Sequence, residues 1–431
     1  MADPRRVLLV GGGDLAGEVC EALEAGGGDV TWLEQADDES VRDALEQKRP
    51  DLVCVATRDD AFPLRIALLV RHLDESVPLL VTIFDPGMAE QIADTLPNCQ
   101  VTSLADIVAP TLAGPCIDPD LLAVRRKDER GFGLDERLEQ VDLPPQQPHR
   151  VRSFVTALLQ PYDRSAALLI YGFAGLVLML AFELFGAMIV LDQAFADAFY
   201  GSAKSLATVG PNIDVDDGPK WFKVAIGCSV ILTLLSAACF TGGLINRLVD
   251  SSLTGLFGKR AVPRRDHVIV IGLGQVGLRL CMLLRECGVP VVAVDADEDS
   301  ETVGLARRMK IPVVIGRGAN PALLRRLSPK SARAFAAVTD VDLVNIESAL
   351  TARSLNADLR VILRAGDGDV ADETRSLFRI GHVIDVHRLG AAYIAGVALG
   401  SDADAVAVRE GTPELLLPDG GHESFPLEIA K

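Results

Sequence analysis

The stretch Phe195–Asn212, FADAFYGSAKSLATVGPN, lies between the two most apolar runs of the chain and has the pattern of neither a membrane span nor an ordinary loop. Ala196–Ala207 has a helix-compatible composition without proline, and it runs directly into Thr208-Val209-Gly210. The hydroxyl and carbonyl oxygens of such a tripeptide replace the water shell of a cation at a constriction. We therefore predict a short helix and a filter for monovalent cations within residues 195–212.

The flanking runs are long enough to cross a bilayer. Ser165–Leu191 is apolar with Glu183 as its one charge, and Val224–Ile245 has no ionisable residue other than cysteine. About 20 apolar residues span the hydrocarbon core, so we predict membrane helices at 165–191 and 221–247. For Glu183 two interpretations stay open: it faces a protein interface or the short helix, or it reaches the membrane surface.

Basic residues outside these runs predict the orientation, because cytoplasmic flanks of membrane helices are enriched in Lys and Arg. They precede the first span at Arg150, Arg152 and Arg164, and they follow the second at Arg247, Lys259, Arg260, Arg264 and Arg265. We expect a multi-pass protein of the plasma membrane, with a membrane domain at 161–250, both termini in the cytoplasm and the re-entrant loop facing out.

The helix, re-entrant loop and helix resemble the pore unit of the potassium-channel family, whose filter reads TVGYG. In this chain the filter positions are occupied by Thr208, Val209, Gly210, Pro211 and Asn212. The resemblance implies four subunits around one axis, that is, a homotetramer in a lipid bilayer. Proline fixes φ and lacks an N–H, so the outer part of the filter is rebuilt, and potassium selectivity stays open against passage of several cations. A chance TVG in a tight turn is the alternative.

Two further sets of residues follow from this reading. Acidic side chains beyond the filter form rings at the outer mouth of a tetramer and concentrate cations, or else they belong to a solvated loop. These are Asp214, Asp216 and Asp217. Small residues in the second span suit close helix packing, or act as a gating hinge as in the family resembled. The hinge candidates are Gly227, Gly242 and Gly243.

Residues 1–125 predict a first Rossmann-like domain, an α/β doubly wound fold. The buried strand Val7–Val10 is followed by a glycine-rich turn and a helix, and Glu34 ends the next strand, where it is placed to accept from ribose hydroxyls. Gly11, Gly13 and Ala16 give the turn a G-x-G-x-x-A spacing, which lets a pyrophosphate approach the helix N-terminus. The alternative is a domain that keeps the turn and binds nothing.

Residues 266–400 predict a second such domain, after a basic linker at 251–265. Gly272, Gly274 and Gly277 form a full G-x-G-x-x-G between a strand and a helix, and Asp295 ends the following strand as the expected ribose-binding carboxylate. A carboxylate there repels a 2′-phosphate. The motif therefore predicts NAD or another adenine nucleotide as ligand in preference to NADP.

The two domains align without a gap over the first strand, turn and helix, so the chain contains an internal repeat. Beyond that, Val313–Gly316, Ala336–Asp340 and Arg360–Arg364 resemble the regulator-of-potassium-conductance (RCK) domain, also called TrkA-N. Arg317 stands where that family commonly has an acid, and it either neutralises a phosphate or removes the usual ligand contact. We predict a linker at 126–160 and a tail at 401–431 that is too short for the family's C-terminal lobe.

The net charge and the cysteine spacing limit which binding partners the chain is expected to have. A formal charge of −18 and a pI near 4.8 argue against nucleic acid, although divalent cations stay possible as ligands. The eight cysteines form no C-x-x-C pair and have no zinc-type spacing to histidine, so no metal site is assigned and a reducing cytosol suits them.

The favoured hypothesis is a ligand-gated cation channel, not an enzyme, whose opening is controlled by cytosolic nucleotide- or ion-binding domains. A membrane-anchored NAD-dependent oxidoreductase is the first alternative, because Tyr200 and Lys204 match a Y-x-x-x-K pair, although that pair lies in the predicted pore helix. A non-conducting nucleotide sensor with a degenerate pore is the second.

Overall fold

The computed structural model describes residues 4–57, 60–127, 130–143, 164–207, 218–249, 265–366 and 381–429. The chain divides into two compact units, one made of residues 1–148 with 263–431 and the other of residues 149–262. The predicted filter and outer mouth, 208–217, lie outside the described residues, as does all but the last residue of the predicted linker at 251–265.

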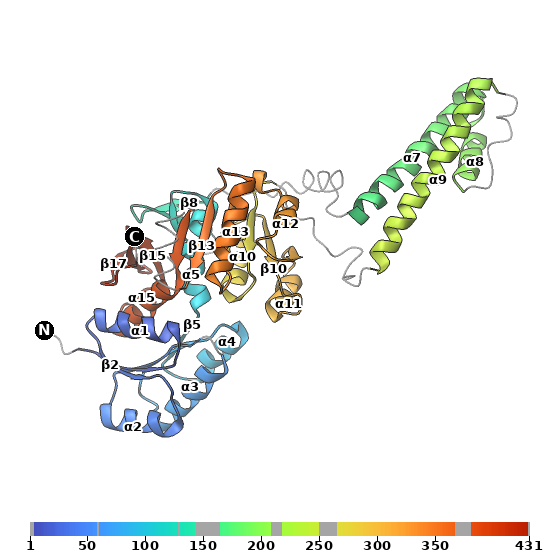
Figure 1. The fold of residues 1–431 in the computed structure, drawn as a ribbon. Helices are drawn as coiled ribbons and strands as arrows, with labels where there is room; N and C mark the ends of the chain where they lie inside the picture. The colour runs from blue at the N-terminus through green and yellow to red at the C-terminus, as the bar shows by residue number, and fades with distance from the viewer. Residues whose placement is uncertain are drawn as a thin grey trace. The chain divides into compact units, whose positions relative to one another are not determined.

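The first large sheet is parallel and has the strand order β2-β1-β3-β4-β5 (Figure 1). Residues of β3 and β4 are all buried, as expected for strands covered by helices on both faces. The strands are β1 (Arg6–Val10), β2 (Asp29–Leu33), β3 (Leu52–Val55), β4 (Leu79–Thr82) and β5 (Cys99–Thr102). The helices are α1 (Asp14–Ala25), α2 (Asp38–Lys48), α3 (Ala61–Leu73), α4 (Pro86–Thr95) and α5 (Leu104–Ile117).

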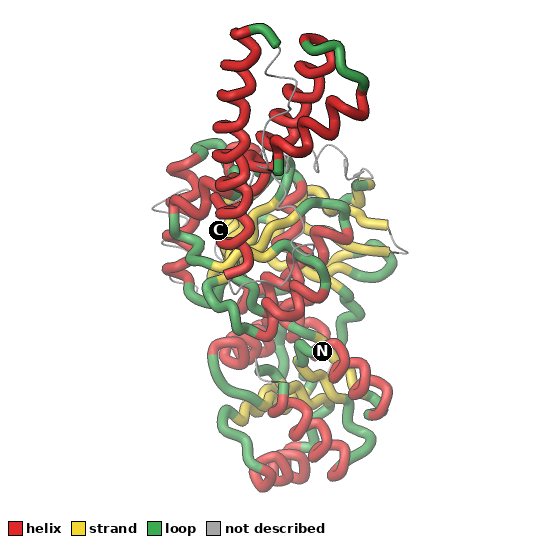
Figure 2. Tube along the Cα trace, turned by 90° about the vertical axis from the view of Figure 1, so that its right-hand side faces the viewer, coloured by secondary structure: helices red, strands yellow, loops and turns green. Residues whose placement is uncertain are grey.

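The second large sheet is also parallel, with the order β11-β10-β9-β12-β13-β14. Figure 2 shows helices beside the strands of both sheets. The strands are β9 (Val268–Ile271), β10 (Val291–Asp295), β11 (Val313–Ile315), β12 (Ala334–Ala337), β13 (Val361–Ala365) and β14 (His382–Asp385). The helices are α10 (Gln275–Glu286), α11 (Glu301–Arg308), α12 (Pro321–Arg326), α13 (Asp342–Leu355) and α15 (Val386–Leu399), with a 3₁₀ turn, η2, at Pro329–Ser331.

The two sheets repeat one plan, in which β1, β2, β3, β4 and β5 correspond to β9, β10, β12, β13 and β14. The difference is that β10 continues into β11 and α12, whereas β2 leads through α2 directly into β3. The second sheet thereby has the 3-2-1-4-5-6 order of dinucleotide-binding folds, and the first has the 2-1-3-4-5 order. The predicted pair of Rossmann-like domains is confirmed.

The two domains exchange helices and share a core. Helix α5, which follows the first sheet, packs against α10, and α15, which follows the second sheet, packs against α1. A Cβ on Gly390 of α15 would lie 2.2 Å from a methyl carbon of Leu104, so these helices lie very close. Buried residues of both sheets form one continuous apolar cluster. The two domains therefore form one packed body.

Two predictions about connecting segments are wrong. Residues 126–127 and 130–142, expected within the linker 126–160, continue a small antiparallel sheet, and residues 405–424, expected in the tail 401–431, form a second one. Their strands are β6 (Leu121–Lys127), β7 (Arg130–Asp135), β8 (Gln140–Asp142), β15 (Ala405–Arg409), β16 (Thr412–Leu416) and β17 (His422–Ser424). The two sheets bury Leu134 and Leu416 in one small core, so a few apolar residues suffice despite the charged composition.

The other unit is a helical hairpin with a short third helix. It consists of α7 (Arg164–Val190), α8 (Phe195–Leu206) and α9 (Lys220–Val249). The prediction placed the spans at 165–191 and 221–247. Helices α7 and α9 approach closely because α7 carries glycines at the contact: a Cβ on Gly172 would lie 2.5 Å from the backbone nitrogen of Phe240.

Both long helices are long and apolar enough to cross a membrane, over Leu168–Val190 and Lys220–Ile245. Only 11% and 17% of their most apolar stretches are buried, so neither is the core helix of a water-soluble unit. Large apolar side chains such as Phe185, Ile189 and Ile231 are instead more than half exposed. An apolar surface of this kind requires a lipid or protein environment.

Candidate functional site

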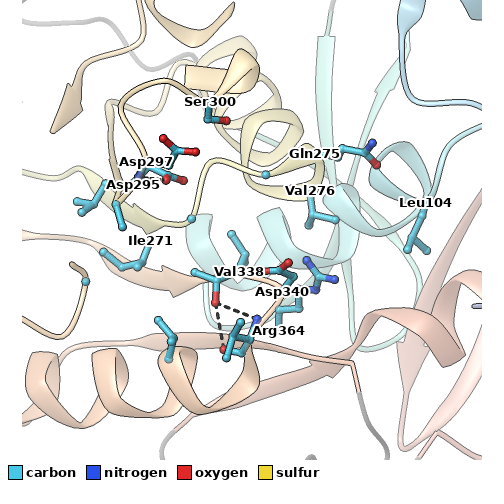
Figure 3. A pocket seen from close by; sticks show the side chains of 18 of the residues that line it. Leu104, Ile271, Gln275, Val276, Asp295, Asp297, Ser300, Val338, Asp340 and Arg364 are labelled. Carbon is cyan, nitrogen blue, oxygen red and sulfur yellow. Dashed lines mark hydrogen bonds between the residues drawn. The ribbon is translucent and has the colours of Figure 1, made fainter. Parts of the chain in front are cut away.

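A cavity of about 840 Å³ opens at the carboxyl ends of the strands of the second sheet (Figure 3). It lies where the strand order reverses, between β9 and β12, which is where parallel α/β sheets bind ligands. The loops after β9, β10, β11 and β12 supply most of its lining. Three of the predicted nucleotide-binding residues line it, namely Gly272, Gly274 and Asp295.

The three motif glycines have different physical roles. Gly272 has φ of 93°, and a Cβ there would lie 2.7 Å from the methyl carbon of Thr339. A Cβ on Gly277 would lie 1.9 Å from the carbonyl oxygen of Gly272, so this glycine lets α10 start against β9. Gly274 has nothing within 4 Å of the Cβ position. Two glycines thus shape the turn, and the third leaves room for a ligand.

Gly277 of α10 and Gly304 of α11 differ in the space around their Cβ positions, so alanine at each is expected to affect the free energy of unfolding differently. We expect Gly277→Ala to lower the free energy of unfolding of the first unit by about 1–3 kcal/mol, because the added methyl group collides with backbone. The matched control is Gly304→Ala in α11, where the nearest atom is the Arg308 guanidinium at 3.7 Å and alanine gains up to about 1 kcal/mol of helix propensity. Thermal unfolding of the full chain checks both. Equal stability of the two variants would contradict the close approach.

Asp295 ties the phosphate turn to the neighbouring strand. Its carboxylate accepts a hydrogen bond from the Leu273 N–H at 2.6 Å and another from the Asp297 N–H at 2.9 Å. The turn precedes the N-terminus of α10, whose free N–H groups favour a phosphate. The carboxylate therefore lies where a ribose attached to that phosphate would be recognised.

Two arginines add positive charge to the cavity. Arg317 is exposed on the loop after β11, and Arg364 on β13 is 9% exposed. Figure 3 shows Arg364 beside Asp340, on the opposite side of the cavity from Asp295 and Asp297. The sequence analysis did not assign Arg364 to the site, although an arginine at the carboxyl end of the apolar strand Val361-Ile362-Leu363 was a usable signal.

The loop that carries Asp340 is fixed by Asn345. The Asn345 side-chain oxygen accepts from the Thr339 N–H at 2.9 Å and from the Thr339 hydroxyl at 2.8 Å. The Asn345 amide nitrogen donates to the carbonyl oxygens of Thr339 and Arg364 at 3.0 and 3.1 Å. Asn345 is 1% exposed, so this network preorganises two edges of the cavity.

The first domain completes the wall of the cavity. Phe84 and Leu104 line it, and Figure 3 shows Leu104 to the right of Gln275 and Val276, the first residues of α10. Asp60 accepts from the N–H groups of Phe84 and Asp85 at 2.8 and 3.0 Å, which holds this loop. The sequence analysis missed these residues. No local pattern identifies them, because they reach the site only through packing of the two domains.

The corresponding residues of the first domain do not line this cavity. Gly11 has φ of 138°, with a would-be Cβ 2.2 Å from the Ala56 carbonyl oxygen, and Ala16 is fully buried in the place of Gly277. The Trp32 indole N–H donates to the Gly11 carbonyl oxygen at 2.8 Å. No atom lies within 4 Å of the Cβ position of Gly13, whereas a Cβ on Gly12 would contact Glu34. The turn is retained, and whether these four residues bind a nucleotide stays a prediction.

In the helical unit, Gly227 and Gly242 have nothing within 4 Å of the Cβ position, whereas Gly243 is buried. Among the residues that the structure describes, no atom outside the local helix backbone therefore approaches the Cβ positions of these two glycines. Lys204 lies 5.7 Å from the centre of the Tyr200 ring, so both residues of the Y-x-x-x-K pair are on α8. Among the residues that the structure describes, no group of three His, Cys, Asp or Glu is placed to hold a metal ion.

Comparison with known proteins places the second domain in a family. Residues 268–385 match the TrkA-N domain, which confirms the resemblance seen in the sequence. Potassium channel protein 1 of Methanocaldococcus jannaschii is 22% identical over 240 residues, covering 54% of this chain and 70% of the relative. Voltage-gated potassium channel Kch of Escherichia coli is 22% identical over 222 residues, covering 48% of this chain and 52% of the relative.

Among solved structures, one of the GsuK channel is similar over 94% of this chain and 67% of its own, with a TM-score of 0.52 and 16% identity. At this identity the likeness shows the fold. The two curated relatives are potassium channels by name and not enzymes, as predicted for this chain. The chain is thus homologous to potassium channels over about half of its length.

Proposed function

We propose that this chain forms a cation channel of the potassium-channel type, a homotetramer in the plasma membrane with both termini in the cytoplasm, whose opening is controlled by an adenine nucleotide bound in the second domain. The observation that carries the proposal is the position of α8. This helix of 12 residues is too short to cross a bilayer, it lies between two helices of membrane length, and it ends just before Thr208.

Assembly follows from the same geometry. A single hairpin cannot enclose an aqueous path, and re-entrant backbone is tolerated at membrane depth only where protein or a watery cavity covers it. Four symmetric copies supply that cover. Gly227 and Gly242, whose Cβ positions are open among the described residues, then suit an interface between copies or points of bending.

The ligand follows from the charges of the cavity. The glycine turn and the N-terminus of α10 suit a phosphate, and Arg317 and Arg364 offset negative charge. Asp295 and Asp297 suit ribose hydroxyls and repel a 2′-phosphate, which favours NAD or an adenine nucleotide over NADP. The first domain forms part of the wall, so binding acts on the packed pair of domains.

Ion flux through purified protein in liposomes tests the proposal, because a channel transports ions, whereas an oxidoreductase or a non-conducting nucleotide sensor does not. We expect potassium flux that changes on addition of NAD, ADP or ATP. The control is a variant with alanine at residues 208–210, which should carry no flux. Wild-type vesicles no more permeable than protein-free vesicles, at every nucleotide concentration, would exclude the channel.

A further inference from the structure

A buried carboxylate joins all three helices of the membrane unit. Glu183 on α7 is 7% exposed. One of its oxygens, Oε1, accepts from the hydroxyl of Ser205 on α8 at 3.0 Å and from the hydroxyl of Ser229 on α9 at 2.6 Å. Both serines are 2% exposed. The interpretation that Glu183 faces the short helix is therefore the correct one of the two left open by the sequence.

The hydrogen bond between Glu183 and Ser205 lies at the C-terminal end of α8. Ser205 is the residue before the last of this helix, and the predicted filter begins three residues later at Thr208. Helices α7 and α9 are the long elements of the unit and pack along each other. The carboxylate therefore connects the segment that enters the filter to the two elements best able to hold it in place.

The helices are closely packed around Glu183. One turn along α7, a Cβ on Gly186 would lie 2.9 Å from the ring of Phe222, so the helices meet closely beside Glu183. Phe222 and Ile226 form a small buried cluster on this side. A carboxyl group in a membrane helix is costly. Without it the buried Ser205 hydroxyl loses its bond to Glu183, whereas the Ser229 hydroxyl keeps the Ile226 carbonyl oxygen, at 2.8 Å, as an acceptor.

We propose that Glu183 is a positioning residue for ion permeation: its carboxylate fixes the C-terminal end of α8, and with it the start of the filter, against both membrane helices. The proposal rests on the proposed channel function and deepens it. It differs from a simple stabilising contact because loss of the hydrogen bond changes the geometry of the filter and not only the stability of the unit.

The test compares two buried serines on the same helix. Ser205→Ala removes the bond from α8 to Glu183, whereas Ser202→Ala removes a bond to the Ala198 carbonyl oxygen within α8 itself. Two properties of the full chain are measured: the potassium-to-sodium permeability ratio in liposomes, and amide hydrogen exchange of residues 203–207 in detergent. Glu183→Gln, which keeps an acceptor oxygen, is compared with Glu183→Leu.

For Ser205→Ala we expect exchange about tenfold faster, on the scale of one buried hydrogen bond, and a permeability ratio changed by about twofold or more. Ser202→Ala should match the wild type in both, and Glu183→Gln should retain more of the wild-type ratio than Glu183→Leu. Identical behaviour of the two serine variants in a conducting protein overturns the proposal. If the wild type carries no ions, the proposed function fails, and unchanged exchange in Ser205→Ala still rejects the positioning role separately.

Discussion

Replacement of Asp295 by alanine is expected to weaken binding of NAD and adenine nucleotides to the full chain by about 1–3 kcal/mol, or roughly 5- to 150-fold in Kd. The variant lacks the carboxylate that we propose binds the ribose hydroxyls. It also no longer holds the N–H groups of Leu273 and Asp297, so the phosphate turn loses a support. Isothermal titration calorimetry with the purified full chain measures the change.

The matched control is Glu34→Ala, at the corresponding position of the first domain. Glu34 does not line the 840 Å³ cavity, so we expect the Kd of the proposed site in the second domain to stay within about twofold of the wild type. A loss in Glu34→Ala equal to that in Asp295→Ala would move the main site to the first domain. Absence of nucleotide binding in the wild type would reject the ligand altogether.

Potassium and sodium are both expected to pass the wild-type pore, with a permeability ratio within about tenfold, while anions are excluded. By analogy with TVGYG we expect Thr208 and Val209 to provide one or two inner cation sites, and we expect Pro211 and Asn212 not to reproduce the outer carbonyl rings. Fewer sites in series discriminate less. The acidic residues after the filter draw in cations of either kind.

Reversal potentials under potassium and sodium gradients measure this ratio. The double variant Pro211→Tyr with Asn212→Gly, which restores TVGYG, should raise the potassium preference by about tenfold or more, and Asn212→Gly alone serves as the control. Strong potassium preference in the wild type would show that a shortened filter suffices. Permeation of chloride would overturn the assignment of residues 208–212 to a filter.

Short sequence patterns predicted the strands, glycine turns and long apolar helices, because each of these depends mainly on neighbouring residues. Continuous apolar strands followed by glycine turns predicted both Rossmann-like domains, because a parallel strand buried on both faces has few other sequences available. The predicted turn residues Gly272, Gly274 and Asp295 do line the cavity. The long apolar runs likewise predicted α7 and α9.

Composition misled where few apolar residues make a small sheet. The segment after Arg125 is charged, and its strands are stable because Leu134 packs against Leu416 from nearly three hundred residues away. The residues around Leu134 in the sequence do not indicate that Leu416 will lie in the same core.

By itself the sequence determined the fold class, the glycine turns and the approximate extent of the two long apolar helices, since each follows from backbone conformation and burial within a few residues. Only the tertiary structure decided that Phe84 and Leu104 of the first domain close the cavity of the second. It also decided that Glu183 bonds Ser205 and Ser229. These contacts join residues 20 to more than 150 positions apart, and they exist only because exchanged helices and a close helix hairpin bring distant side chains within hydrogen-bonding or packing distance.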